Sequence, residues 1–160
     1  MEYKASTDLR VKLTTVFVAL LFAFLIYNQV QHNSQLRLIT AIILGIAFVG
    51  SFCLSTLKYT INENSLVIVT PLYNKTIRKK DIFRVDLVNR KDLGFMIRLF
   101  GNGGLFGYYG WYRAANLGKF FFYGTQMKNL ILIQMNTGSK YMITPDDTSI
   151  LSELQPSNLP

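Results

Sequence analysis

The sequence predicts an integral membrane protein in which two hydrophobic helices form a hairpin ahead of a mainly β, basic domain. Three observations lead to this fold class. Residues 13–36 and residues 38–57 contain no Asp, Glu, Lys or Arg. Short β-like runs separated by turn residues begin at Lys58. Half of the 160 residues are hydrophobic although the net charge is +8, a combination that is typical of a basic protein with part of its chain in a membrane.

The first expected element after a cytoplasmic N-terminal segment (residues 1–12) is a transmembrane helix over residues 13–30. About 20 residues at 1.5 Å each cross the hydrocarbon core of a bilayer. The strongly apolar part from Leu13 to Tyr27 reaches this length with the uncharged residues that follow it. Those following residues are bulky and polar and lack the small residues of a signal-peptide cleavage site, so we expect the helix to be retained.

An external loop is expected over residues 31–37 and a second transmembrane helix over residues 38–57. Cys53, the only cysteine, lies in this helix and is expected to be a packing residue, because a disulfide needs a second cysteine. Lys and Arg residues flank both open ends of the hairpin, whereas the loop carries only Arg37. The positive-inside rule therefore predicts a multi-pass protein of the cell (inner) membrane with both termini in the cytoplasm.

Residues 58–155 are expected to form one cytoplasmic domain, with a tail over residues 156–160. The alternating pattern predicts about seven short antiparallel strands, at residues 59–61, 66–70, 76–77 with 82–88, 96–100, 120–123, 130–135 and 141–144. Pro145 and two aspartates then precede Ile150, Leu151 and Leu154 at helical spacing, which predicts a C-terminal helix. This order of elements suits a small bent sheet or barrel that the helix covers at one end.

Three segments of this domain resemble the bacterial pleckstrin-homology (PH) domain family of small membrane proteins. They are residues 98–112, where an arginine precedes Phe-Gly and repeated glycines precede an aromatic residue, residues 117–125, and residues 141–147 with their Thr-Pro-Asp-Asp ending. The resemblance covers about residues 58–155. It implies a PH-like antiparallel β-barrel or sandwich with a C-terminal capping helix, and it implies neither a ligand nor a catalytic residue.

Patterns for catalysis are missing from the sequence. The single histidine, His32, falls in the expected external loop, so a cytoplasmic Ser–His–Asp or Cys–His set is unavailable. The glycine-rich residues 101–107 follow neither the GxGxxG nor the P-loop pattern. We therefore expect a non-enzymatic protein with no catalytic residue, no metal site and no cofactor. Nucleic acid is not an expected partner, because no zinc-finger or basic-zipper pattern is present.

Two groups of residues are candidates for binding contacts. The basic group around the second β-hairpin suits anionic lipid headgroups, at roughly 1 kcal/mol for each cation near the membrane, although a solvated charged edge is the alternative. Its members are Lys75, Arg78, Lys79, Lys80 and Arg84. The aromatic group, in the glycine-rich stretch, fits the core of a bent hairpin, an exposed platform for a partner, or a tip inserted in the lipid interface. Its members are Phe106, Tyr108, Tyr109 and Trp111.

These features predict a membrane protein that displays its PH-like domain for contact with an anionic lipid surface or with a protein. The basic group favours this function. The alternative is an assembly or regulatory subunit of a membrane complex that self-associates through the PH-like domain, as a homo-oligomer or with a membrane-protein partner. Small residues in the second helix, among them Gly45 and Gly50, favour this alternative because they let helices approach closely.

Overall fold

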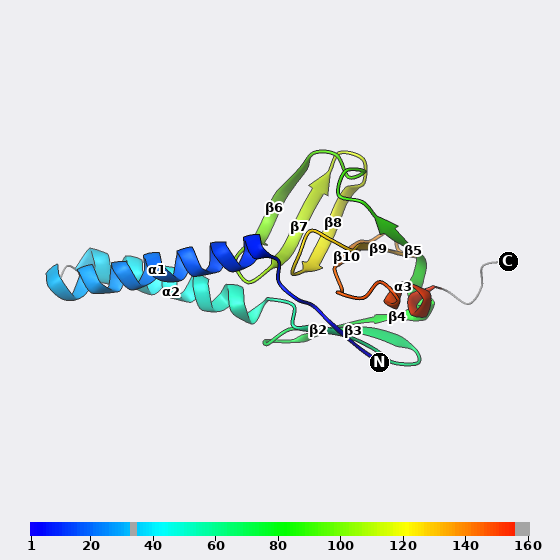
Figure 1. Cartoon of the computed structure of the whole chain (residues 1–160), viewed down its shortest axis with the longest axis horizontal. Helices are drawn as coiled ribbons and strands as arrows, with labels where there is room; N and C mark the ends of the chain where they lie inside the picture. The colour runs from blue at the N-terminus through cyan, green and yellow to red at the C-terminus, as the bar shows by residue number, and fades with distance from the viewer. Residues whose placement is uncertain (33–34, 156–160) are drawn as a thin grey trace.

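A helical hairpin projects from a mainly β domain that consists of two sheets (Figure 1). This computed structural model describes the backbone of residues 1–32 and 35–155 and the side chains of residues 1–28 and 38–155. The helices are α1 (Leu9–His32), α2 (Gln35–Cys53) and α3 (Ile150–Leu154), with a 3-10 turn, η1 (Lys79–Asp81). The strands are β1 (Glu2–Lys4), β2 (Lys58–Ile61), β3 (Ser65–Val69), β4 (Asn74–Arg78), β5 (Ile82–Val88), β6 (Met96–Gly103), β7 (Tyr108–Ala114), β8 (Gly118–Gly124), β9 (Leu130–Met135) and β10 (Lys140–Ile143).

The two helices of the hairpin have different limits from those predicted. α1 begins at Leu9 because Asp8 caps it: the backbone N–H of Val11 donates to the Asp8 carboxylate at 2.9 Å. α2 ends at Cys53 because the chain then joins the first sheet, where the N–H of Leu57 donates to the carbonyl of Val69 at 2.8 Å. The predicted loop at residues 31–37 is therefore largely helical, although residues 33–34 lie outside the described residues, as does the predicted tail at residues 156–160.

Among the described residues, α1 alone is long and apolar enough to cross a membrane. Its window from Leu9 to Asn28 has a mean hydropathy of 2.1, and only 6% of that window is buried inside the protein. The apolar part of α2, Leu38–Cys53, is shorter than the 18 residues that such a window needs. The prediction of a full-length second span over residues 38–57, and with it a multi-pass topology, is thus not supported. The reason is that α2 ends at Cys53, and the last residues of the predicted span connect it to the first sheet.

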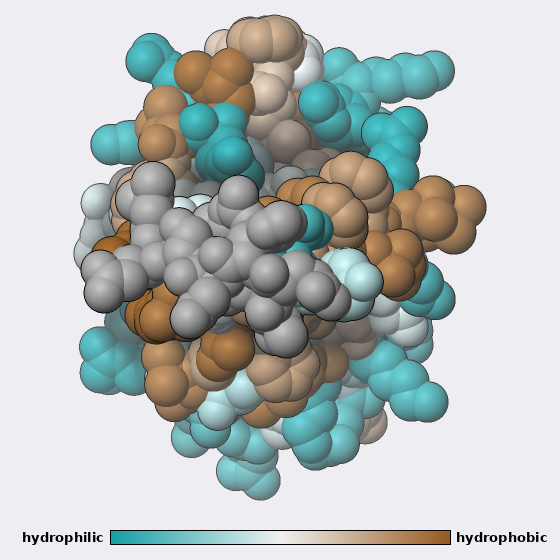
Figure 2. Space-filling view, turned by 90° about the vertical axis from the view of Figure 1, so that its left-hand side faces the viewer, coloured by the Kyte–Doolittle hydropathy of each residue, from teal (hydrophilic) through white to brown (hydrophobic). Residues whose placement is uncertain are grey.

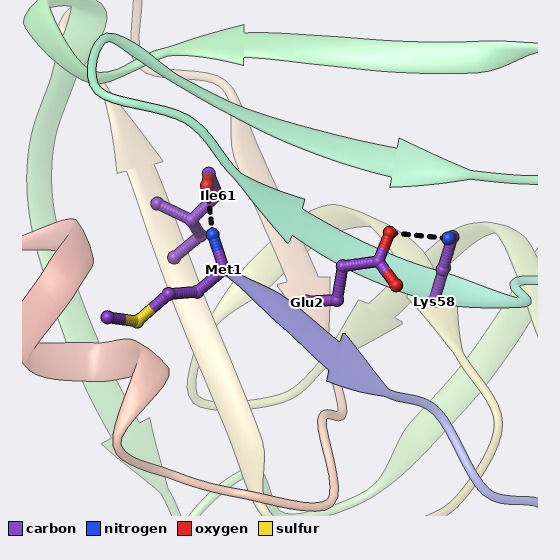
Figure 3. A network of polar contacts seen from close by, with 4 residues as sticks. All are labelled: Met1, Glu2, Lys58 and Ile61. Carbon is purple, nitrogen blue, oxygen red and sulfur yellow. Dashed lines mark hydrogen bonds and ion pairs between the residues drawn. The ribbon is translucent and has the colours of Figure 1, made fainter.

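The segment before α1 is an integral part of the β domain, which the sequence pattern did not reveal. β1 pairs antiparallel with β2, so that Glu2 lies opposite Thr60. Figure 3 shows the amino group of Met1 donating to the carbonyl of Ile61 at 2.7 Å, and Lys58 at 2.6 Å from the carboxylate of Glu2. The lysine lowers the pKa of this carboxyl through its hydrogen bond and its charge. The chain on both sides of the hairpin therefore meets in adjacent strands.

The domain is mainly β, as predicted, but the described strands form two open sheets rather than a closed barrel. Strands β1-β2-β3-β4 form one sheet, and strands β5-β9-β10-β8-β7-β6 form the other. The turn η1 interrupts the ladder after β4 and sends the chain into the second sheet, so the stretch predicted as one strand across residues 76–88 is two strands in different sheets. The edges β5 and β6 of the second sheet are not paired with each other.

The prediction of only antiparallel strands is wrong for one pair. β10 runs parallel to β8, with Tyr141 opposite Phe121, and antiparallel to β9. β9 and β10 form a tight hairpin, and β10 rather than β9 lies beside β8. All four residues from Leu130 to Ile133 are buried, because the two faces of β9 serve two different cores, and such a continuous apolar run is typical of a central strand.

Two apolar cores lie on opposite faces of the second sheet. The first core lies between the sheets, and its members include Tyr59, Ile68, Val85, Ile131, Ile133 and Ile143. The second core lies on the other face under the β5–β6 connection, and its members include Leu93, Tyr112, Phe120, Phe122, Leu132 and Met142. The predicted C-terminal helix is confirmed as α3, which places Ile150 and Leu154 in the first core with no exposed surface.

Candidate functional site

The hairpin exposes apolar side chains along most of its length. Large hydrophobic residues of both helices are exposed, among them Leu13, Phe17, Leu20, Phe24, Ile42 and Ile46. In Figure 2, which looks along the hairpin toward the domain, hydrophobic side chains gather across the middle of the view and most hydrophilic side chains lie toward its upper and lower edges. A soluble domain rarely exposes such a continuous apolar surface, and the long apolar helix α1 in particular suggests membrane association.

The hairpin is docked on the turn between β6 and β7 through Phe106. The ring of Phe106 packs edge-on against Phe48 at 5.0 Å and Phe52 at 5.3 Å, both in α2. Its backbone N–H donates to the hydroxyl of Thr15 in α1 at 3.0 Å. Phe106 has a φ of 59°, in the left-handed region that is uncommon for a bulky residue. This turn therefore joins both helices to the second sheet without a flexible linker.

Two glycines allow β6 and β7 to approach closely beside this turn. Gly101 and Gly110 lie opposite each other, with φ values of 112° and 125°. A Cβ atom on either glycine would lie 2.2 Å from a carbonyl oxygen of the other strand, which no structure tolerates. The glycine-rich stretch thus forms a tight, bent hairpin, and this supports the first of the three interpretations of the sequence at the level of the backbone.

The other three aromatic candidates occupy different environments. Tyr108 is half-buried and stacks on Phe122 at 5.5 Å, toward the second core. Tyr109 faces the first core. Trp111 is 40% exposed, with Lys119 lying 5.6 Å from the centre of its indole ring. The four predicted aromatic residues are therefore not one surface, and Trp111 is the only one of them on open surface.

Three tyrosine hydroxyls meet where the two sheets come together. Tyr73, from the β3–β4 turn, lies 2.9 Å from the Tyr109 hydroxyl and 3.2 Å from the Tyr123 hydroxyl. Burial raises the pKa of Tyr73 and of Tyr123 to about 12, and it also raises the pKa of Tyr109. Neutral hydroxyls at this position link the first sheet to the second, so the cluster is a structural junction.

The predicted basic group is spread over β4, η1 and β5 and does not gather at the helical hairpin. The start of β4 is near the end of α2, because Leu72, two residues before Asn74, donates to the Cys53 carbonyl at 3.0 Å. Arg78 lies opposite Ser65 at the other end, about 13 Å away at 3.3 Å per residue. Lys75 is thus near the hairpin, whereas Arg78, Lys79, Lys80 and Arg84 lie away from it.

Two members of the basic group already have acidic partners. Arg78 lies 2.8 Å from Asp81, and Arg84 lies 2.7 Å from Asp86. Lys75 lies 5.6 Å from the centre of the Tyr141 ring. Exposed ion pairs of this kind contribute roughly 0–1 kcal/mol, so they leave the arginines free to exchange partners.

An aromatic and cationic surface that the sequence analysis missed lies across β6, β7 and β8. Residues directly opposite each other in an antiparallel ladder share a face. Ile97 lies opposite Arg113, Phe100 opposite Trp111, and Arg113 opposite Lys119. We call these five residues the β6–β8 face: Ile97, Phe100, Trp111, Arg113 and Lys119. Phe100 is 76% exposed, so the face combines exposed apolar side chains with cations.

The sequence contains part of the pattern of the β6–β8 face, but the strand register is needed to recognise it. Trp111 and Arg113 stand two residues apart, as residues on one face of a strand must. The β-bulge between Arg98 and Phe100 shifts that alternation in β6, so Phe100 joins a face that simple counting assigns to Leu99. In Figure 1, β6 is the edge strand on the side from which the hairpin leaves.

No group of three or more His, Cys, Asp or Glu side chains that could hold a metal ion occurs in the described part of the chain. The only cysteine, Cys53, is a free thiol at the end of α2. Its backbone carbonyl accepts the hydrogen bond from Leu72, so its position serves the junction between the hairpin and the first sheet.

The comparisons with known proteins identify the β domain. A family model described as the bacterial PH domain matches residues 57–156, which is more than half of the chain. No curated protein and no solved structure matches the chain. The matched range includes both sheets except β1, which the chain contributes from the far side of the hairpin.

Proposed function

Because this chain belongs to the bacterial PH-domain family, we propose that it is a non-enzymatic membrane protein whose PH-like domain contacts an anionic lipid surface. PH domains are in general interaction modules, which supports a binding role. The observation that carries the membrane part of the proposal is the exposure of α1: a helix with a mean hydropathy of 2.1 and 6% burial is not the core helix of a soluble protein.

The strand pairing supports entry and exit of the hairpin at one membrane face. β1 precedes α1, β2 follows α2, and the two strands are hydrogen-bonded neighbours. α1 is about 36 Å long at 1.5 Å per residue, longer than the roughly 30 Å of the hydrocarbon core, and the shorter α2 lies beside it, with Phe48 stacked on Phe22 at 6.3 Å. We propose that the hairpin is embedded in the cell (inner) membrane and that its flanking cations hold the domain and both termini in the cytoplasm.

The β6–β8 face supports contact between the domain and the lipid surface. Tryptophan and cations are the side chains that favour the headgroup region, and Trp111 lies beside Arg113 and Lys119. The basic group of β4 and β5, Lys75 to Arg84, is a second proposed contact with anionic headgroups. Lys75 is the member of this group that lies nearest the hairpin.

Trp111 provides the test, because it is the only tryptophan of the chain. The full chain would be placed in nanodiscs whose lipids carry brominated acyl chains, which quench tryptophan near the bilayer. We expect stronger quenching of Trp111 when phosphatidylglycerol is added to phosphatidylcholine, and weaker quenching at high salt, because salt screens exposed charges.

Two variants that each remove two positive charges separate the proposed contacts. Arg113→Gln with Lys119→Gln is expected to reduce the quenching more strongly than Lys79→Gln with Lys80→Gln, which removes two cations of the second proposed contact. A loss confined to the second variant would move the contact to the β4–β5 group. Quenching that depends on neither lipid charge nor salt would overturn the proposal of an electrostatic lipid contact.

Self-association of the PH-like domain is the second candidate function, because β6 is an unpaired edge with exposed apolar side chains. Phe95 and Phe100 are 78% and 76% exposed. An open edge with apolar residues can pair with the same edge of a second copy. In that case Phe100→Lys should convert a dimer of the detergent-solubilised chain into a monomer in light scattering, whereas a chain that is monomeric from the start would exclude this function.

A further inference from the structure

A pocket of about 660 Å³ lies at the base of the hairpin, where the start of α1, the end of α2 and the β6–β7 turn meet. One part of its wall is apolar and consists of Val11, Val16, Phe52 and Phe106. Another part is polar, with Lys12, Thr15, Ser55 and Thr56. Neither the PH-domain family match nor the proposed contact through the β6–β8 face accounts for this pocket, because no residue of that face lines it.

The two kinds of wall suit a ligand with an anionic end and an apolar end. Lys12 is the only charged residue in the wall, so the pocket has a positive charge with no acidic side chain among its lining residues. Val16 and Phe52 lead from there onto the exposed apolar sides of α1 and α2. A soluble anion would use only the cationic part, whereas a lipid would use both.

Thr56 supplies an independent sign that a polar partner is missing. Its side chain is buried, with the residue 4% exposed, and its hydroxyl makes no hydrogen bond within the described part of the chain. By contrast, the hydroxyl of Ser55 donates to the Phe52 carbonyl at 2.8 Å, and that of Thr15 accepts from Phe106. An unpaired buried hydroxyl is unfavourable, so a ligand oxygen in reach of Thr56 would gain a ready donor.

We propose that this pocket binds the headgroup of an anionic phospholipid, with its phosphate between Lys12 and Thr56 and an acyl chain along Val16 and Phe52. The inference rests on the proposed insertion of the hairpin, because insertion places the hairpin base at the level of the headgroups. The bound lipid would fill the space between α1, α2 and the Phe106 turn and would fix the angle between the hairpin and the domain.

The test uses the full chain in detergent and measures the midpoint of thermal unfolding during titration with dioctanoyl phosphatidylglycerol. We expect a rise in the midpoint, and we expect Lys12→Gln and Thr56→Val each to weaken apparent binding about tenfold, the usual effect of losing one hydrogen bond to a charged group. Arg10→Gln is the matched control, because Arg10 is a neighbouring cation that does not line the pocket.

Thr56→Val also separates binding from folding. Without lipid this variant should be at least as stable as the parent chain, because it removes an unpaired buried hydroxyl and keeps the shape of the side chain. A variant that is stable but no longer responds to lipid supports the site. A parent chain and a Thr56→Val chain that respond equally would exclude a role for the hydroxyl and overturn the proposal.

Three further arms identify the ligand. Dioctanoyl phosphatidylcholine should bind more weakly than phosphatidylglycerol, and inorganic phosphate should leave the midpoint unchanged. Inorganic phosphate that reproduces the full shift would make this a site for a soluble anion. Equal loss of binding in Arg10→Gln and Lys12→Gln would show that the lipid responds only to diffuse positive charge.

Extraction of membranes with alkaline carbonate tests the insertion of the hairpin separately. A chain that stays in the membrane but does not respond to the lipid overturns only the proposed pocket. A chain that is washed off the membrane overturns the proposed function.

Discussion

Phe106 is the residue that couples the hairpin to the β domain. Its ring lies between Phe48 and Phe52, and its backbone bonds to Thr15, so one turn residue contacts both helices. The left-handed backbone at this position costs free energy for a bulky residue, and the contacts of the ring and the N–H offset that cost. Side-chain packing rather than backbone preference therefore selects Phe106.

Phe106→Ala is expected to loosen this junction. The variant loses two aromatic contacts worth about 0.5–1.5 kcal/mol each, so we expect a loss of roughly 1–3 kcal/mol in the free energy of unfolding. Hydrogen exchange should quicken at the amides around the β6–β7 turn and remain unchanged in β9. Phe83→Ala is a suitable control, because Phe83 is 65% exposed on β5. Equal effects of the two variants would contradict a special role for Phe106.

The tyrosine cluster predicts a sensitivity to alkaline pH. Tyr73 and Tyr123 have a pKa raised by burial to about 12, above the ordinary value of about 10 that applies in the unfolded chain. The stability that comes from keeping these hydroxyls neutral is fully present below pH 10 and is lost as the pH rises through about 12. We expect the near-ultraviolet absorbance of tyrosinate to rise in two steps, and unfolding to accompany the second. A single step near pH 10 in the folded chain would contradict this cluster.

The β6–β7 hairpin depends, as an element, on the glycine pair Gly101 and Gly110. Gly110→Ala would place a methyl group 2.2 Å from the Phe100 carbonyl oxygen, so the two strands must move apart. We expect this variant to unfold at least 2 kcal/mol more easily or to accumulate as insoluble protein, since both overlap and backbone strain act on it.

Gly138→Ala, in the turn between β9 and β10, is the control that separates the cost of a left-handed backbone from the cost of steric overlap between strands. Gly138 also has a positive φ, of 81°, but an added Cβ meets no atom within 4 Å. It should therefore show only the smaller cost of a left-handed backbone, about 1 kcal/mol. Chemical denaturation of both variants, followed by circular dichroism, gives the difference. Equal losses would show that close approach of the strands is unimportant.

The whole molecule is organised around the return of the chain to its starting point. β1 and β2 bring residues 2–4 and 58–60 into one sheet, so the two ends of the helical hairpin join the domain side by side. In a bilayer, both ends would therefore lie on the same side. Tyr3 is buried in the first core, and the Asp146 carboxylate accepts hydrogen bonds from the backbone and hydroxyl of Ser6. The N-terminal residues are thus locked to the end of the domain.

Cysteine labelling tests the resulting topology. In a Cys53→Ala background, His32→Cys places one thiol at the last residue of α1, and Glu63→Cys places one on the domain, between β2 and β3. In right-side-out membrane vesicles, a membrane-impermeant maleimide should label the first and not the second. In inside-out vesicles the pattern should reverse. Labelling of both thiols on the same side would show that the hairpin enters the membrane without crossing it.

Some features were decided by local sequence alone. The uncharged runs predicted the two helices, because lipid and packed apolar faces both require long stretches without charge. The strand runs, Gly-rich turns and the spacing of Ile150 and Leu154 predicted a mainly β domain with a C-terminal helix, and the Gly-aromatic segments predicted the bacterial PH-domain family, which is confirmed. These signals depend on neighbours within a few residues, so the sequence carries them directly.

Tertiary structure decided what depends on register and on contacts between distant residues. The pairing of β1 with β2, the parallel pair β8 and β10, and the separation of the two sheets at η1 join residues far apart in the chain. The β6–β8 face needed the bulge in β6, and the pocket at the hairpin base needed three segments to meet. Period-two patterns give no information on which strands become neighbours, because the same alternation fits several pairings; packing selects one of them.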